Sequence, residues 1–228
     1  LDAQRGLIRL SLEARKYQEA LRLARTVQEQ RPKAAAGFAL EGDVANVQKQ
    51  WTQAAAAYKA ALQREALPEI ATKMHAVLLA SGNAAEADRF ASTWIKDHPK
   101  DGLFLAYQAE QALSRNDLAT AERHYRTVLR MLPDNVVALN NLAWVTARLK
   151  KDGAIELAEK ANRLAPDTPA FMDTLAMLLA DQQEFGRAIE LQSAALALQP
   201  TNPSLRLSLA RIYIKSGEKA KARAQLEQ

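Results

Sequence analysis

The chain has 228 residues, of which 48% are hydrophobic and 25% are charged, with a formal net charge of +5 and no cysteine. The lack of cysteine excludes a disulfide scaffold, a thiolate nucleophile and a zinc site built on sulfur. Only 8 glycines and 8 prolines accompany 46 alanines and 32 leucines, which argues against a β-sandwich and a disordered chain and favours an all-α fold.

Prolines set the period of the predicted helices. Pro99, Pro133, Pro166 and Pro200 follow one another at intervals of about 34 residues, and Pro32 precedes Pro99 by close to two such periods. Each proline follows an alanine-rich helical stretch that it cannot continue. We therefore predict a single array of helix–turn–helix repeats, at 1–34, 35–67, 68–101, 102–135, 136–168, 169–202 and, incomplete, 203–228.

Small residues recur at one place in the first helix of five repeats and at one place in the second helix of all seven. Where the helices must approach closely, the first helix carries Gly42, Ala109, Ala143, Ala176 and Ala210, and the second helix opens with Ala20, Ala54, Ala87, Ala121, Ala154, Ala188 and Ala222. Several first helices begin with capping chemistry, at Asn135, Thr168 and Asn202, the last two followed by a proline.

The region 35–99 departs most from this pattern. Ala66 stands where a closing proline is expected, Pro68 comes two residues late, and His75 replaces a small residue. We expect helices there with irregular packing or register, and we predict that this region is the least stable part of the array.

These positions resemble the tetratricopeptide repeat (TPR), a helix–turn–helix repeat of about 34 residues. The resemblance covers essentially the whole chain and implies a right-handed superhelix that binds a peptide or partner helix on a concave face lined by the first helices. Carried over position by position, it implies partner contacts at Arg5, Arg9, Asp43, Asn46, Glu110, Asn140, Trp144, Arg148, Asp173, Met177, Asp181, Arg211 and Lys215.

Trp144 is the most informative of these residues, because an exposed tryptophan is typical of interface hot spots. The alternative is that Trp144 packs between repeats beside Ala143. Trp51 and Trp94 are expected in the core. Arg5 and Arg9 are followed in the next repeat by Ala39 and Asp43, which does not match the two-carboxylate clamp of co-chaperone TPR proteins.

No pattern in the sequence predicts catalysis. His75, His98 and His124 lie in different repeats without metal-ligand spacing, and no phosphate-binding, nucleophile-elbow or zinc-protease motif occurs. The carboxylate pair Asp181 and Glu184 is expected to face solvent. We therefore expect no enzyme activity, no catalytic residue, no metal and no cofactor.

The charge pattern points to protein partners. Basic and acidic residues are interleaved without a long Lys/Arg run, which argues against nucleic-acid binding, and no apolar run is long enough to span a membrane. Because the chain starts at Leu1 without a methionine and stops in mid-pattern, we expect a fragment of a longer protein. Its apolar end, including Leu226, predicts possible end-to-end self-association.

A finer resemblance concerns the second half. The runs Ala138–Trp144, Leu157–Ala161, Leu164–Asp167 and Asp173–Ala176 are similar to bacterial envelope TPR proteins, in particular the TPR-repeat lipoprotein of PEP-CTERM/exosortase systems and TPR subunits of exopolysaccharide export. This resemblance implies a periplasmic scaffold tethered by a lipid on an upstream cysteine. A cytosolic TPR adaptor or chaperone, and a recruiting module attached to an enzyme domain outside this sequence, stay open as alternatives.

Overall fold

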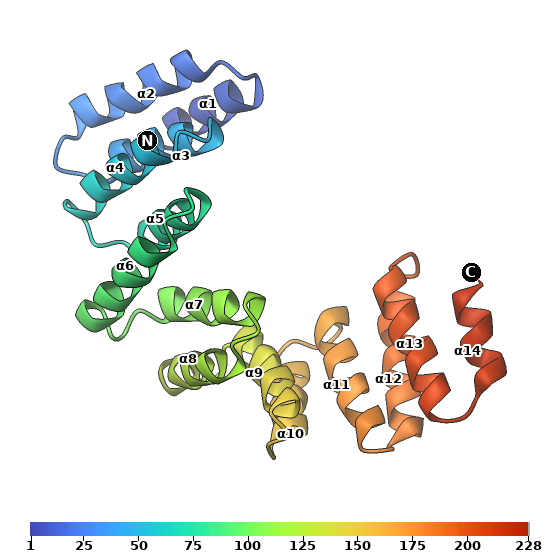
Figure 1. The fold of residues 1–228 in the computed structure, drawn as a ribbon. Helices are drawn as coiled ribbons and strands as arrows, with labels where there is room; N and C mark the ends of the chain where they lie inside the picture. Colours follow the sequence, from blue (N-terminus) through green and yellow to red (C-terminus); the bar gives the residue numbers. More distant parts are fainter. Residues whose placement is uncertain (228) are drawn as a thin grey trace. The chain divides into compact units, whose positions relative to one another are not determined.

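A computed structural model describes residues 1–227, and every regular element in them is an α-helix. This confirms the all-α solenoid fold. Figure 1 shows the fourteen helices of this part of the chain, which are α1 (Asp2–Glu13), α2 (Tyr17–Gln30), α3 (Ala36–Val47), α4 (Trp51–Leu62), α5 (Pro68–Ala80), α6 (Ala84–Asp97), α7 (Gly102–Ser114), α8 (Leu118–Met131), α9 (Val136–Arg148), α10 (Ala154–Leu164), α11 (Pro169–Asp181), α12 (Phe185–Leu198), α13 (Pro203–Lys215) and α14 (Lys219–Leu226).

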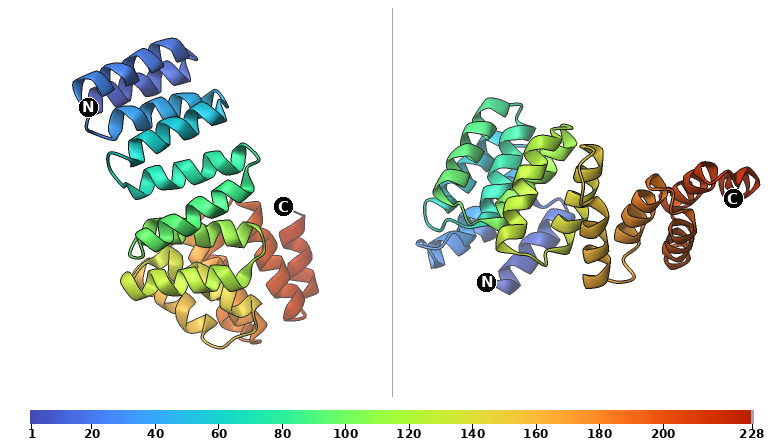
Figure 2. Two further views of the ribbon diagram at one scale, coloured as in Figure 1. Left: turned by 60° about the vertical axis from the view of Figure 1, so that its left-hand side comes forward. Right: turned by 90° about the horizontal axis from the view of Figure 1, so that it is seen from below.

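The chain divides into two compact units, Leu1–Tyr107 and Gln108–Gln228, called here the N-terminal and C-terminal units. In the N-terminal unit the pairs α1–α2, α3–α4 and α5–α6 follow one another, and α1 also packs against α3 (Figure 2). In the C-terminal unit α9, α11 and α13 pack in sequence, each covered by its own second helix, α10, α12 or α14. Each unit is therefore a layered stack of helix pairs, as in a solenoid.

The turn between the two helices of a pair is the same throughout. A residue with positive φ closes the first helix at Arg15, Lys49, Gly82, Asn116, Lys150, Gln183 and Gly217, so the turn recurs once in each repeat. The next residue donates its N–H to a carbonyl five positions back, as Lys16 does to Ser11 at 2.7 Å and Gln50 to Ala45 at 2.9 Å. This left-handed cap satisfies carbonyls that the end of a helix leaves unpaired.

The small residues lie at helix contacts, as the sequence predicted, because larger side chains would clash there. A Cβ added to Gly42 would lie 2.5 Å from Cε1 of Tyr58, a fully buried side chain on α4. The predicted alanines of both helices are buried, except for half-buried Ala154. The alanine surplus therefore reflects close approach of backbones inside and between repeats.

Capping is only partly as predicted. Asn135 accepts the N–H of Ala138 at 2.9 Å, and Asn202 accepts that of Ser204 at 3.0 Å, which confirms both caps. Thr168 occupies the N-cap of α11 and Pro169 follows in its first turn, as predicted, but the side chain of Thr168 makes no capping hydrogen bond. Pro68 does not close α4 late; it is the first residue of α5, where its missing N–H leaves no donor unpaired.

The region 35–99 forms four continuous helices despite its departures from the repeat pattern. His75 is buried and its Nδ1 lies 2.9 Å from the hydroxyl oxygen of Tyr107. Trp94 is also buried, as predicted, and donates from Nε1 to Asp101 at 2.7 Å, while half-buried Trp51 packs against the core of α3–α5. In this region, the larger side chains of His75 and Trp94 thus occupy packing positions that small residues hold in other repeats.

Candidate functional site

The N-terminal unit contains a groove of about 800 Å³ along its first helices α1, α3 and α5. Ile8, Leu40 and Ile70, one from each helix, are among the apolar residues that line it. Charged side chains of both signs surround them and include Arg5, Arg9, Arg31, Asp43, Glu65, Glu69 and Lys73. Apolar surface beneath alternating charges suits a peptide that carries apolar and charged residues in turn.

Asp43 joins this groove to the core beneath it. Its carboxylate accepts the hydroxyl of Tyr58 at 2.8 Å and the ammonium of Lys73 at 2.7 Å. Burial, followed by the negative charge of Asp43, raises the pKa of Tyr58 far above its ordinary value, so Tyr58 stays a neutral donor. Asp43 is thereby held in place with part of its surface facing the groove.

Three predicted contact residues, Arg5, Arg9 and Asp43, line this one groove. Asn46 is exposed near the end of α3 and is not among the lining residues. Lys73 was missed, because the repeat pattern assigns no contact to its position and only its long side chain brings the ammonium to Asp43. The sequence feature that could have indicated Lys73 is the acidic residue Asp43 in the preceding repeat, with which it forms an ion pair.

In the C-terminal unit, α9 presents an aromatic–cation pair. Trp144 is 43% exposed, so it does not occupy the core position considered as the alternative, and the guanidinium of Arg148 lies 5.5 Å from the centre of its ring. Asn140 is half-buried and donates to Asn141 at 3.3 Å. Asn140, Trp144 and Arg148 are four residues apart and share one face of α9.

The neighbouring helices continue this face. The ammonium of Lys215 on α13 forms an ion pair with Asp181 on α11, and Arg211 is exposed one turn before Lys215. Met177 is half-buried against the core of α11, whereas Asp173 accepts from Gln192 at 2.7 Å and so also supports packing. The structure therefore brings Asp181 and Lys215 together.

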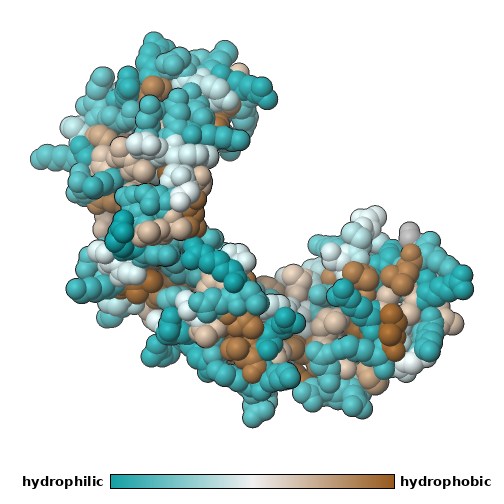
Figure 3. Space-filling view, viewed as in Figure 1, coloured by the Kyte–Doolittle hydropathy of each residue, from teal (hydrophilic) through white to brown (hydrophobic). Residues whose placement is uncertain are grey.

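Glu110 on α7 is exposed, as expected of a contact residue. His124 on α8 is half-buried and not exposed as the sequence suggested, and this burial lowers its pKa. Figure 3 shows a largely hydrophilic surface with hydrophobic patches over α9–α10 and over α13–α14. Exposed Leu207, Ile214 and Leu226 belong to these last two helices.

Within residues 1–227, no group of three or more His, Cys, Asp or Glu residues is placed to hold a metal ion. In the same part of the chain, no helix combines the length and apolar character needed to cross a membrane.

Family models identify these helix pairs as a known repeat. Two family models, both described as tetratricopeptide repeat, match the chain, one at residues 6–69 and 108–170 and the other at residues 179–228. The chain belongs to the tetratricopeptide repeat family. TPR arrays are generally scaffolds for protein–protein interaction, which is the coarse function of this chain as well.

Two relatives share part of this TPR array. The chain is 38% identical over 101 residues to a TPR repeat-containing protein of Pseudomonas aeruginosa, covering 41% of this chain and 17% of that protein. It is 33% identical over 167 residues to Cellulose synthase 2 operon protein C of Komagataeibacter xylinus, covering 70% of this chain and 12% of that protein. The chain therefore spans less than a fifth of the length of either relative.

Among solved structures, a tetratricopeptide repeat protein from Parabacteroides merdae superposes with a TM-score of 0.71 at 17% identity. The match covers 85% of this chain and 77% of that one. At this identity the similarity establishes the shared TPR fold alone.

Proposed function

We propose that this TPR chain is a non-catalytic scaffold of a bacterial cell-envelope assembly. In this proposal, a peptide or helix of a partner protein lies along the first helices of the repeats. The proposed contacts are the predicted set from Arg5 to Lys215, with Lys73 added in the N-terminal unit.

The observation that carries this proposal is the groove along α1, α3 and α5. Arg9 and Lys73 contribute positive charge on either side of Asp43, above the apolar side chains of Ile8 and Ile70. A partner segment with alternating charges could exchange ion pairs with these residues while burying its own apolar side chains. In the C-terminal unit, the exposed ring of Trp144 is the proposed anchor.

We further propose a periplasmic location and a link to exopolysaccharide export or PEP-CTERM protein sorting. The similarity to Cellulose synthase 2 operon protein C and the resemblance of the Ala138–Trp144 run to envelope TPR proteins support this link. The proposed attachment to the membrane is a lipid on a cysteine upstream of this sequence. Fractionation of the natural full-length protein tests the location, and recovery in the cytosol would favour a cytosolic adaptor.

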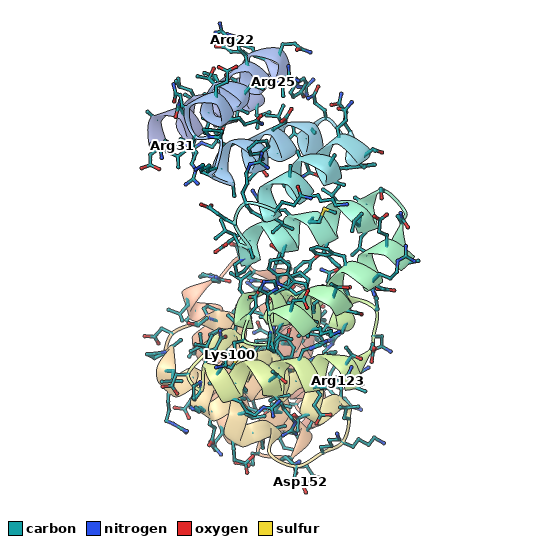
Figure 4. The ribbon with its side chains drawn as sticks, turned by 90° about the vertical axis from the view of Figure 1, so that its left-hand side faces the viewer. Arg22, Arg25, Arg31, Lys100, Arg123 and Asp152 are labelled. Carbon is teal, nitrogen blue, oxygen red and sulfur yellow. The ribbon has the colours of Figure 1, made fainter. Side chains whose placement is uncertain are left out.

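The groove is tested by affinity capture from envelope extracts, with partners quantified by mass spectrometry. We compare Arg9→Glu/Lys73→Glu with Arg22→Glu/Lys59→Glu, which changes the net charge equally at exposed positions on the second helices α2 and α4. Figure 4 labels Arg22 on α2. The first variant should recover about tenfold less of a specific partner and the second should match the wild type. Equal recovery by both variants would refute the groove.

A further inference from the structure

A second groove lies within the C-terminal unit, along its second helices. It has a volume of about 660 Å³ and is formed by the second helices α8 and α10 and the helix α9 between them. Half-buried Leu129 on α8 and Leu157 on α10 supply apolar surface, and buried Leu142 on α9 lies beneath them. Its size is within the range of clefts that bind ligands.

This outer groove is separate from the surface proposed above for partner binding. Leu142 is two residues from both Asn140 and Trp144, which is a rotation of about 200° around a helix. Leu142 therefore points to the opposite side of α9. A partner in the outer groove would leave Trp144 and Arg148 uncovered.

One wall of the outer groove is an arginine stripe on α8, made of Arg123, Arg126 and Arg130. Their spacing of three and four residues places them on one face of the helix, over a length of about 10 Å. Figure 4 labels Arg123 on α8. The stripe thus runs along the groove for two helical turns.

Part of the positive charge of this wall has no ion pair within the protein, although the carboxylate of Asp117 interacts electrostatically with Arg123. Glu122, the one acidic residue among those lining the groove, is 8% exposed and accepts Lys151 at 2.6 Å and Arg126 at 2.9 Å. Arg123 and Arg130 donate instead to neutral hydroxyls, those of Thr120 at 3.2 Å and Thr127 at 2.9 Å. Among the described residues, neither of these two arginines has a carboxylate oxygen within ion-pair distance.

We propose that the outer groove binds an acidic amphipathic helix of a protein partner. Carboxylates spaced by three and four residues on such a helix match the arginine stripe, and apolar side chains beside them bury against Leu129 and Leu157. Each half of the groove thereby selects one face of the ligand. The proposal goes beyond the first-helix groove and does not depend on it.

Nucleic acid fits this groove less well. No aromatic residue is among those that line it, so bases would have no stacking partner, and leucine surface gains nothing from phosphates. A peptide carrying both carboxylates and leucines uses every part of the lining.

The test is fluorescence anisotropy with a labelled helical peptide of about 20 residues, with glutamates at i, i+3 and i+7 beside a leucine stripe. The intact chain should bind it saturably, and Arg123→Glu/Arg130→Glu should weaken binding by about tenfold or more. Replacing the leucines of the peptide by serine should weaken binding by a similar factor. Circular dichroism checks that the variant stays helical.

Two matched controls locate the binding. Arg22→Glu/Arg89→Glu makes the same change in net charge at exposed arginines of α2 and α6, and Arg9→Glu/Lys73→Glu alters only the N-terminal groove. Both should bind the peptide within about twofold of the wild type.

Four results would overturn the proposal. The first is no saturable binding of the peptide at about 1 mM, the second is an equal loss in the Arg22→Glu/Arg89→Glu control, and the third is tighter binding of an oligothymidine than of the peptide. A serine peptide that binds as well as the leucine peptide would also refute it, because the apolar floor would then contribute nothing.

Discussion

Substitutions at three glycines of the N-terminal unit test three different contributions to the stability of the repeats. Gly37 on α3 lies against α2, and an added Cβ would lie 2.6 Å from the backbone nitrogen and 2.9 Å from Cα of Gln28. Gly6 on α1 has nothing within 4 Å of an added Cβ. Gly82 also has open space around it, but its φ is +78°. Alanine at these positions therefore tests close packing, helix propensity and backbone strain separately.

For Gly37→Ala, a gain of up to about 1 kcal/mol from helix propensity opposes a larger steric cost. Overpacking a tight contact costs about 1–3 kcal/mol or more, and here the contacted atoms belong to a helix backbone that cannot rotate away. We expect the free energy of unfolding of the N-terminal unit to fall by about 2 kcal/mol. Gly6→Ala should raise it by up to about 1 kcal/mol, and Gly82→Ala should lower it by about 1 kcal/mol.

The assay is urea unfolding followed by circular dichroism, combined with hydrogen exchange of peptides from α2 and α3. Hydrogen exchange is needed because a repeat array can unfold in parts. In Gly37→Ala, faster exchange should be greatest in α2 and α3. A Gly37→Ala protein as stable as the wild type, or a Gly6→Ala protein destabilised as much, would show that close approach of α2 and α3 is not what the glycine serves.

Three further predictions concern side chains. Hydrogen bonds and ion pairs from Lys151, and then from Arg126, hold the pKa of Glu122 below its ordinary value. The ionised carboxylate therefore stabilises the folded protein above the ordinary carboxyl pKa. This contribution is lost as the pH falls through the lower pKa of the folded state. Glu122→Gln should lower stability at pH 7 by about 1–2 kcal/mol and flatten this acid-side loss, measured by urea unfolding from pH 3 to 7; an unchanged pH profile would refute the pairing. Tyr58→Phe removes the hydrogen bond to Asp43 and should cost about 1 kcal/mol in thermal unfolding, with no change counting against that bond. Trp144→Ala should lower stability by about 1 kcal/mol or less, because the residue is 43% exposed and lies outside the core, yet reduce partner capture. A large loss of stability would assign Trp144 to the core.

The sequence predicted the solenoid because its signals are local. Proline positions and in-phase alanines report helix ends and close contacts, and Ala143 and Ala176 are buried as their spacing requires. Position 75 does not need the small residue that the repeat pattern predicts, because Phe104 and Tyr107 pack edge-on against the ring of His75. Tertiary packing can thus replace a consensus small residue, which one sequence does not reveal.

Glycine positions in the sequence do not locate the turns between the two helices of each pair. The left-handed position is occupied by Arg15, Lys49, Lys150 and Gln183 as well as by glycine and asparagine. The hydrogen bonds of each cap and the packing of the helix pair compensate the strain of a left-handed residue with a side chain. Periodicity locates such turns better than residue type does.

The candidate contact residues were partly predictable for the same reason. Arg5, Arg9 and Asp43 meet because equivalent positions of successive first helices align, and Asp181 meets Lys215 in the same way. The outer groove was not predicted, since it depends on the space between α8 and α10 and on which arginines lack carboxylate partners. Those properties follow from three-dimensional placement and not from spacing along the chain.

The most direct test of partner binding is photo-crosslinking in intact envelopes of cells that make the full-length protein. A benzophenone amino acid replaces Arg9 or Trp144 on the first-helix face, or the exposed Arg22 on α2. We expect the first two positions to crosslink to one discrete partner protein and position 22 not to do so. Crosslinks from position 22 to that partner, with none from positions 9 and 144, would contradict this expectation.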